Sequence, residues 1–313
     1  MRAAAILSMA EDAAVFYYPD SGKIKKLSLT GGTVYAAPVG RTGRNSFFTR
    51  CGSLGCRSAA GDGRYLYIAA SHASGILRLD TYSGASVFRH CIGRYPMQLC
   101  LWNGYIITAC GETDTVEICL CSGGQSFISN RLGQALCGVC AAKNVCAAVC
   151  FLQEALYLLS VPQLTVLKEI KLGFAPNGVC TLRTEKKGEG FLVYGNEADG
   201  RGCAALFDIS GDMLLFGRTG FNPVDAVQTG DTVVFSCAGD KALLLHKAHD
   251  LMPLRSFALG AMPEGICLCG EDILVGMNVA GRVEKHSMKN GRLLKQLPGI
   301  CEPSQIIMID MPY

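Results

Sequence analysis

Cysteine is the residue type that most suggests a chemical role in this sequence. The chain has 313 residues and 17 cysteines, and Cys137 and Cys140 form a Cys-x-x-Cys pair. Cys146 and Cys150 follow closely. Pairs at this spacing ligate zinc or carry out thiol–disulfide exchange in other proteins. The first question is therefore whether the fold allows these thiols to act together.

Motifs for other chemistry are missing from the sequence. It contains no Gly-x-Ser-x-Gly elbow, no His-Glu-x-x-His helix and no phosphate-binding Gly-x-x-x-x-Gly-Lys loop. His246 and His249 lie three residues apart beside Asp250 and could ligate a metal from a helix, but we predict a polar hairpin turn there. The sequence therefore predicts no catalytic residue, no metal ligand and no cofactor.

An internal repeat organises the chain. Pro223 and Pro263 are 40 residues apart, Pro303 follows after another 40, and Pro176 precedes Pro223 by 47. Each unit holds about four short β-runs separated by Gly or Asn turns, and no run of helical period interrupts the series. This period, with four strands per unit, is typical of β-propeller blades. The seven additional residues of the long step fall at 185–190, where we expect a longer hairpin turn.

The number of blades follows from the positions where the units begin. Starts near residues 54, 96, 134, 176, 223 and 263 define six blades, and the start at Pro303 leaves only eleven residues. Residues 3–7, 13–18 and 23–29 supply three further strand-like runs. We therefore predict an all-β, seven-bladed propeller with four-stranded blades, forming a single domain over residues 1–313. Both chain ends build one blade, with the strand around 306–309 innermost, so the ring has no open edge.

The repeat also gives the cysteines a structural interpretation. The unit position of Cys140 is occupied in other units by Cys100, Cys180, Val227, Cys267 and Ile307. A position that accepts Val, Ile or Cys requires a small buried apolar side chain, and free cysteine is among the most buried residue types. A regular strand would also point Cys137 and Cys140 to opposite faces. We therefore expect packing rather than metal or redox chemistry at this pair.

Composition excludes several classes of protein. Half of the residues are apolar, but the longest apolar runs, such as 145–152, are too short to cross a bilayer as a helix. The 29 basic and 26 acidic residues are spread along the chain, which gives no support for nucleic-acid binding. An odd number of cysteines in a chain too long to need disulfides favours a reducing cytoplasm.

One unit carries a family resemblance. Residues 62–70 begin Asp-Gly-Arg and continue as a hydrophobic run, residues 76–80 form a second strand, and Ser83-Gly84 closes the unit. This sequence pattern resembles the YVTN-type repeat of bacterial seven-bladed propellers. The resemblance implies the fold, and it includes the lactonase-like family, surface or periplasmic binding proteins and many cytoplasmic propellers. WD-repeat propellers share the period, but the only tryptophan is Trp102, so their Trp-Asp mark is absent.

Polar residues beside the repeat prolines form the first candidate site. The innermost strand of each blade begins there, so these residues should line one mouth of the central channel. They are Gln98, Asn177, Asp225, Glu264, Glu302 and Gln305. Such a ring of carboxylates and amides could hold a cation or a polar ligand. An ordinary water-filled mouth is the alternative.

A departure from the repeat at about residues 32–55 forms the second candidate site. About twenty residues are surplus to the closing blade in this region. They include three arginines and two adjacent phenylalanines: Arg41, Arg44, Phe47, Phe48 and Arg50. Long loops on rigid scaffolds often carry function, and such a set suits an anionic ligand or a protein partner. A solvated connection without function is the alternative.

Two functions remain open from the sequence. The first is a non-catalytic binding or interaction protein that uses the channel mouth and the 32–55 loop to hold a protein or a small polar or anionic ligand. The second is a lactonase-like hydrolase, in which Glu264 or Asp225 activates water against a sugar lactone. The first is favoured because the sequence shows no catalytic constellation.

Overall fold

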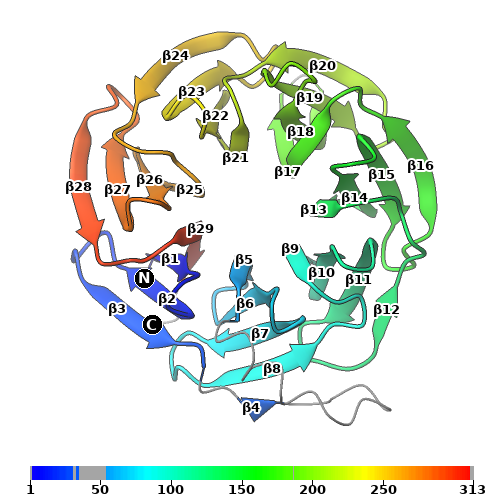
Figure 1. Ribbon diagram of the computed structural model, residues 1–313, viewed down its shortest axis with the longest axis horizontal. Helices are drawn as coiled ribbons and strands as arrows, with labels where there is room; N and C mark the ends of the chain where they lie inside the picture. The colour runs from blue at the N-terminus through cyan, green and yellow to red at the C-terminus, as the bar shows by residue number, and fades with distance from the viewer. Residues whose placement is uncertain (1, 31–32, 35–53, 186, 311–313) are drawn as a thin grey trace.

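Seven β-sheets stand radially around a central channel (Figure 1). The computed structural model describes residues 2–30, 33–34, 54–185 and 187–310. Six of the sheets have four strands and one has five, and within each sheet the four strands of the repeat pair antiparallel in consecutive order. The predicted all-β seven-bladed propeller is confirmed.

Blades are numbered here in chain order, with strands given from the channel outward. Blade 1 contains β29 (Pro303–Asp310), β1 (Arg2–Ser8), β2 (Ala13–Tyr17) and β3 (Ile24–Ser28). Blade 2 contains β5 (Cys56–Gly61), β6 (Tyr65–Ala70), β7 (Gly75–Asp80), β8 (Ser86–His90) and, at its outer edge, β4 (Thr33–Val34). Blade 3 contains β9 (Pro96–Trp102), β10 (Tyr105–Cys110), β11 (Thr115–Leu120) and β12 (Ser126–Ile128).

The remaining blades repeat the same order. Blade 4 contains β13 (Leu136–Ala142), β14 (Val145–Cys150), β15 (Ala155–Ser160) and β16 (Val166–Lys171). Blade 5 contains β17 (Ala175–Thr184), β18 (Gly188–Asn196), β19 (Gly202–Asp208) and β20 (Met213–Arg218). Blade 6 contains β21 (Pro223–Thr229), β22 (Thr232–Cys237), β23 (Ala242–Lys247) and β24 (Pro253–Ala258). Blade 7 contains β25 (Ile266–Cys269), β26 (Asp272–Met277), β27 (Arg282–Ser287) and β28 (Leu293–Pro298).

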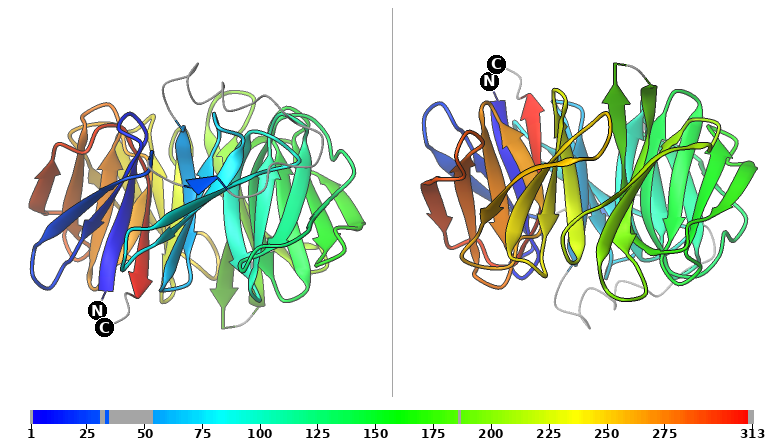
Figure 2. Two further views of the ribbon diagram at one scale, coloured as in Figure 1. Left: turned by 90° about the horizontal axis from the view of Figure 1, so that it is seen from below. Right: turned by 90° about the horizontal axis from the view of Figure 1, so that it is seen from above.

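Both ends of the chain close the ring in blade 1, as predicted. The C-terminal strand β29 is innermost and pairs antiparallel with β1, from Arg2 opposite Asp310 to Ser8 opposite Pro303. The two ends therefore lie side by side on one face of the ring (Figure 2). This pairing joins the last strand to the first and closes the ring of blades.

Two local features differ from the sequence prediction. The additional residues near 185–190 lengthen the strands and do not make a longer turn, because Thr184 pairs directly with Gly188 and β17 and β18 span ten and nine residues. His246 lies within strand β23 and is 3% exposed, so the predicted polar turn at His246 and His249 is wrong for the first of them. Its ring Nδ1 is 2.9 Å from the carbonyl oxygen of Leu251.

The core consists of layers between neighbouring blades. Strand alternation sends side chains to both faces of every sheet, and each face packs against the next blade. Cys100 and Cys180 pack against such layers and Cys140 and Cys267 are buried within them. Burial raises the pKa of Cys100, Cys180 and Cys267 to about 12. These cysteines are therefore neutral packing residues, which agrees with the interpretation from the repeat.

The predicted separation of Cys137 and Cys140 is wrong. The register of β13 shifts between Leu136 and Gly138, which makes Cys137 the additional residue of a β-bulge. Because a bulge interrupts strict alternation, both thiols pack against the same apolar layer between blades 4 and 5. The Sγ atom of Cys137 lies 3.4 Å from the carbonyl oxygen of Pro176.

Most of the 32–55 segment lies outside the described residues, including Arg41, Arg44, Phe47, Phe48 and Arg50. Its residues Thr33–Val34 form β4, which pairs in parallel with β8 at the outer edge of blade 2. Leu54 and Gly55 are buried next to β5. Among the residues that the structure describes, no helix is long and apolar enough to cross a bilayer.

Candidate functional site

The innermost strands begin around a cavity of about 300 Å³ at one end of the channel. Five of the six predicted mouth residues line this cavity: Gln98, Asn177, Asp225, Glu264 and Gln305. Glu302 does not line it. It is exposed, directly before β29, and its negative charge contributes to raising the pKa of Glu264. The structure thus brings residues separated by up to 207 positions into one site.

A bulge at the start of the innermost strands explains this gathering. The register shifts between Cys56 and Ser58 in β5, between Pro176 and Gly178 in β17, and between Pro223 and Asp225 in β21. Each bulge turns the second and third residues of the unit away from regular alternation. As a result, these residues border the channel instead of packing only between blades.

The third residue of several units links its blade to the next. The Oε1 atom of Gln98 accepts a hydrogen bond from the backbone N–H of Val139 in the following blade, at 2.9 Å. Gln305 accepts one in the same way from Ala59, across the junction of blades 1 and 2. Part of the predicted polar ring therefore holds the propeller together, because these side chains satisfy buried backbone donors.

Asp225 makes the same link and is more engaged than a free carboxylate. Its Oδ2 accepts from the backbone N–H of Ile266 at 2.9 Å, and its Oδ1 accepts from Ala226 at 2.8 Å. Burial raises the pKa of Asp225 to about 6, and the charge of Glu264 acts in the same direction, whereas the two N–H donors lower it. Both oxygens are already occupied, so Glu264 is the more available of the two carboxyl groups.

Asn177 spans the junction of blades 5 and 6. Its Nδ2 group donates to Asn222 Oδ1 at 3.1 Å and to the carbonyl oxygen of Pro223 at 2.8 Å. Asn222 also lines the cavity and has a positive φ of 51°. Asparagine adopts this conformation more readily than most residues, which explains its place in the tight approach to β21.

Arg57 was not predicted from the sequence, and among the described residues it is the one arginine that lines the cavity. Arg57 is the bulge residue of β5 and is exposed, and its positive charge acts to lower the pKa of Glu264. Burial has the larger effect, and the pKa of Glu264 is raised overall. The signal was present in the repeat, because Cys56-Arg57-Ser58 corresponds to Pro96-Met97-Gln98. The missing proline concealed the correspondence.

Cys137 and Tyr194 also line the cavity and were not predicted to do so. Burial raises the pKa of Cys137 to about 12, so its thiol is neutral at physiological pH. The ring of Tyr194 fills the space beside Gly178, where a Cβ atom would lie only 2.4 Å from the tyrosine oxygen. The cavity wall is thus a guanidinium, a partly buried carboxyl group and amides, set beside a neutral thiol and a phenol.

The similarity of this chain to known proteins lies in its structure. No protein-family model matches the chain, and no curated protein matches it. A functionally unknown protein from Desulfotomaculum acetoxidans is similar in structure, with a TM-score of 0.78, 9% identity and coverage of 99% of both chains. Hydrazine synthase from Kuenenia stuttgartiensis is similar with a TM-score of 0.70 and 13% identity, covering 87% of this chain and 93% of that one.

A third solved structure belongs to apo AztD from Citrobacter koseri. It has a TM-score of 0.66 and 10% identity, and the match covers 98% of this chain and 97% of that one. At identities this low the likeness extends to the fold and not to the residues of a site. The chain is a seven-bladed β-propeller, and its function has to be argued from its own side chains.

Proposed function

We propose that the protein is a non-catalytic binding protein that holds a small polar ligand with an anionic group in the channel-mouth cavity. The observation that supports this proposal is the position of Arg57. It supplies a cationic group on a wall whose other polar groups include amides and carboxyl groups. A guanidinium is well suited to bind a carboxylate or phosphate through two parallel hydrogen bonds.

Glu264 supplies a second polar group for the ligand. Glu264 lines the cavity and its pKa is raised, chiefly by burial. A hydroxyl or amino group on the ligand would satisfy this carboxyl group, while the cavity amides supply further polar contacts. A cavity of about 300 Å³ suits a small molecule. Polar anions such as hydroxy acids, amino acids and sugar acids fit this description.

The experiment is a ligand screen with matched variants. Thermal-shift and calorimetric titrations with small hydroxy acids, amino acids, sugar acids and sugar phosphates should identify a ligand that stabilises the protein. Arg57→Gln should weaken its binding by about tenfold or more, because a charged hydrogen bond contributes about 1.5–3 kcal/mol. Arg183→Gln is the control, since Arg183 is an exposed arginine near the far end of an innermost strand. Equal binding by both variants would refute the proposal.

The lactonase-like hydrolase is the second candidate. The raised pKa of Glu264 favours it, because a general acid or base works best with a pKa near the operating pH. If it is correct, the purified protein should hydrolyse a member of a sugar-lactone panel. That activity should fall by about a hundredfold or more in Glu264→Gln. If no lactone in the panel is hydrolysed and a ligand binds without turnover, the hydrolase is refuted and the binding function is supported.

The 32–55 loop is proposed as a second binding surface for a partner protein. This part rests on its residue types alone, Arg44 and Phe47 among them. An affinity capture with intact protein should lose a partner when both residues are replaced by alanine. An unchanged partner set after that replacement would count against the surface.

A reducing cytoplasm is proposed as the location, and the YVTN-type propellers as the relatives. All sixteen cysteines of the described residues are free thiols, which supports a compartment that does not oxidise them. Mass spectrometry of alkylated protein purified under non-reducing conditions should find them unpaired. Native disulfides in that preparation would contradict this location.

A further inference from the structure

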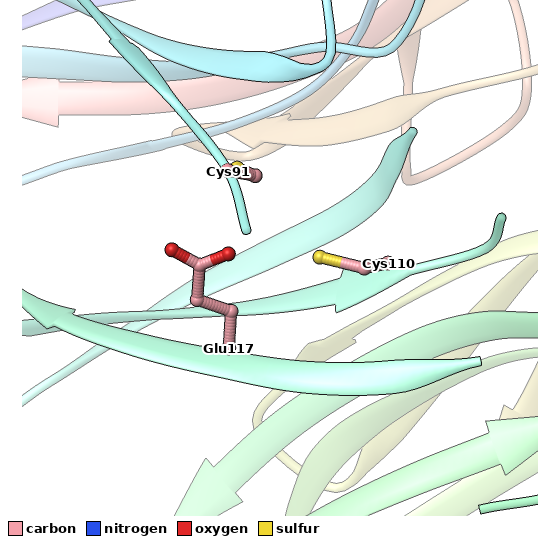
Figure 3. A group of neighbouring side chains, drawn as sticks. All are labelled: Cys91, Cys110 and Glu117. Atoms are coloured by element: carbon pink, nitrogen blue, oxygen red, sulfur yellow. The ribbon is translucent and has the colours of Figure 1, made fainter. Parts of the chain in front are cut away.

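Three chemistry-bearing side chains meet outside the channel, where blade 2 packs against blade 3. Cys91 follows β8, Cys110 ends β10, and Glu117 is the third residue of β11. Their sulfur and carboxylate oxygen atoms lie within 4.8 Å of one another, and all three residues are buried. The side chains gather around one point (Figure 3). In the described ranges no other group of three such residues meets this spacing.

The carboxylate of Glu117 is held in place by one oxygen only. Its Oε2 accepts hydrogen bonds from the backbone N–H groups of Ile92 at 2.6 Å and Gly93 at 3.2 Å. Its Oε1 has no hydrogen-bond partner within the described part of the chain. Glu117 is only 1% exposed, so bulk water does not reach this oxygen either. A buried acceptor left unsatisfied is costly, so native proteins fill such a place with a ligand or water.

A second polar atom without a partner faces the same region. Thr108 lies directly opposite Glu117 in the β10–β11 pairing and two residues before Cys110 on the same strand face. Its Oγ1 is also buried without a hydrogen-bond partner among the described residues. Two orphaned polar atoms beside two thiols indicate a missing polar occupant.

The repeat provides internal comparisons for this position. The N–H of Cys91 donates to the carbonyl of Ser74, and the same bond in later blades is made by Leu132 and Leu259. The equivalent of Cys110 is the last residue of the second strand of a blade, and the equivalent of Glu117 is the third residue of the third strand. The corresponding sets are Leu132, Cys150 and Tyr157 between blades 3 and 4, and Leu259, Met277 and Glu284 between blades 6 and 7. Of these three junctions, only that of blades 2 and 3 has three metal-ligating residues.

The equivalent carboxylate in blade 7 shows what Glu117 is missing. Glu284 is 3% exposed, and its two oxygens accept hydrogen bonds from Arg282 Nε at 2.7 Å and from the His286 ring Nε2 at 2.9 Å. Both oxygens of Glu284 therefore have a side-chain donor, and one of the two donors is the cationic Arg282. Glu117 has no such side-chain donor in the described part of the chain: backbone N–H groups contact one of its oxygens, and two thiols lie beside it.

We propose that Cys91, Cys110 and Glu117 bind one Zn²⁺ ion that joins blade 2 to blade 3. Thiolate sulfur together with carboxylate oxygen suits zinc, whereas calcium and magnesium prefer ligand sets made of oxygen alone. On binding, each thiol releases its proton to solvent and its sulfur becomes a ligand. The ion takes Glu117 Oε1, and a water in the fourth position donates to Thr108 Oγ1, so both orphaned atoms gain a partner.

A pocket and an arginine lie in the same interface between blades 2 and 3. A pocket of about 340 Å³ between the same two blades is lined by Cys119 and Arg89. Cys119 belongs to the same apolar layer as Cys91 and Cys110. The Nη1 atom of Arg89 is buried without a hydrogen-bond partner in the described part of the chain. This guanidinium would offset the net negative charge of two thiolates and a carboxylate around one divalent cation.

The test is zinc uptake by the full chain, reduced and freed of metal with a chelator. Titration against a chromophoric chelator should show one Zn²⁺ per chain, and Co²⁺ should produce a near-ultraviolet thiolate-to-cobalt band. Cys110→Ser should weaken binding by about a hundredfold and Glu117→Gln by about tenfold or more, at least as much as the loss of an outer-shell partner. This site does not depend on the proposed function, so either proposal can fail alone.

Cys150→Ser is the matched control, because Cys150 is a fully buried cysteine at the equivalent place in blade 4. It should bind zinc as the unmodified protein does. The cobalt band of the unmodified protein tests the proposal even if a variant fails to fold. Absence of stoichiometric zinc and of the cobalt band would overturn it, as would unchanged affinity in a folded Cys110→Ser protein. In that outcome, water alone satisfies the orphaned atoms.

Discussion

Replacing Gln98 by methionine tests the conclusion that the mouth residues hold the blades together. Methionine keeps the length of the side chain but cannot accept the hydrogen bond that Val139 N–H donates to Gln98 Oε1 at 2.9 Å. Val139 is 1% exposed, so water has little access to the freed N–H group. A buried donor without a partner costs about 1–3 kcal/mol.

A value near the middle of that range can be measured directly. A loss of about 2 kcal/mol corresponds to a fall in Tm of about 3 °C for a domain of 313 residues. Urea unfolding should show the same loss as a lower midpoint with an unchanged slope. Amide hydrogen exchange should also accelerate locally at Val139, because its hydrogen bond is broken.

The control is Gln134→Met, since Gln134 is exposed in the loop that precedes the same blade. It should change stability by no more than about 0.5 kcal/mol. The reasoning is refuted if Gln98→Met is as stable as this control and exchange at Val139 does not change. In that case the polar ring would contribute to the ligand site alone.

Three further predictions concern the closure of the ring, the pH dependence and the core. Gly265→Ala should lower the free energy of unfolding by about 3 kcal/mol or more, because the new Cβ would lie 2.8 Å from the Gln305 Cα and from the Ser304 carbonyl oxygen in β29. The control is Gly260→Ala, whose Cβ would meet nothing nearer than 3.7 Å and which should be nearly neutral. Urea unfolding of both variants measures the difference. The pKa of Asp225 rises from 3.8 to about 6 on folding, so its contribution to stability is present below about pH 4 and is lost as the pH rises through about 6. Thermal unfolding between pH 4 and 7 should therefore show a smaller loss of stability in Asp225→Asn than in the unmodified protein. Phe235→Ala should lower the free energy of unfolding by about 3–5 kcal/mol, because Phe235 is fully buried between blades 5 and 6, and an unchanged urea midpoint would contradict this.

The sequence could predict the fold because a propeller is built from local repeats. Pro96, Pro223 and Pro303 each begin a unit, and every blade except the closing one forms its repeat sheet from strands that are neighbours in the chain. The spacing therefore determined the number of blades and the closure by β29 and β1. Where the prediction failed, at residues 185–190, the period showed the additional residues but not whether strand pairing would continue through them.

The sites depend on contacts that no single unit contains. The residue positions at the mouth were predictable from their offset to the prolines, but Arg57 was not, because its unit lacks that proline. The engagement of Asp225 by Ile266 became visible only once two blades were placed side by side. A local repeat fixes which residues face the next blade, and the tertiary structure fixes which atoms of that blade they meet.

Cysteine, the most prominent residue type in the sequence, illustrates the same division. The Cys137 and Cys140 pair is conspicuous in the sequence, but the bulge of β13 and the core between blades 4 and 5 make it part of the packing. Cys91, Cys110 and Glu117 form no sequence motif, since they come from three different segments. Only the docking of blade 2 on blade 3 brings them within 4.8 Å. The sequence determined the blades, and the packing between blades decided which side chains can act together.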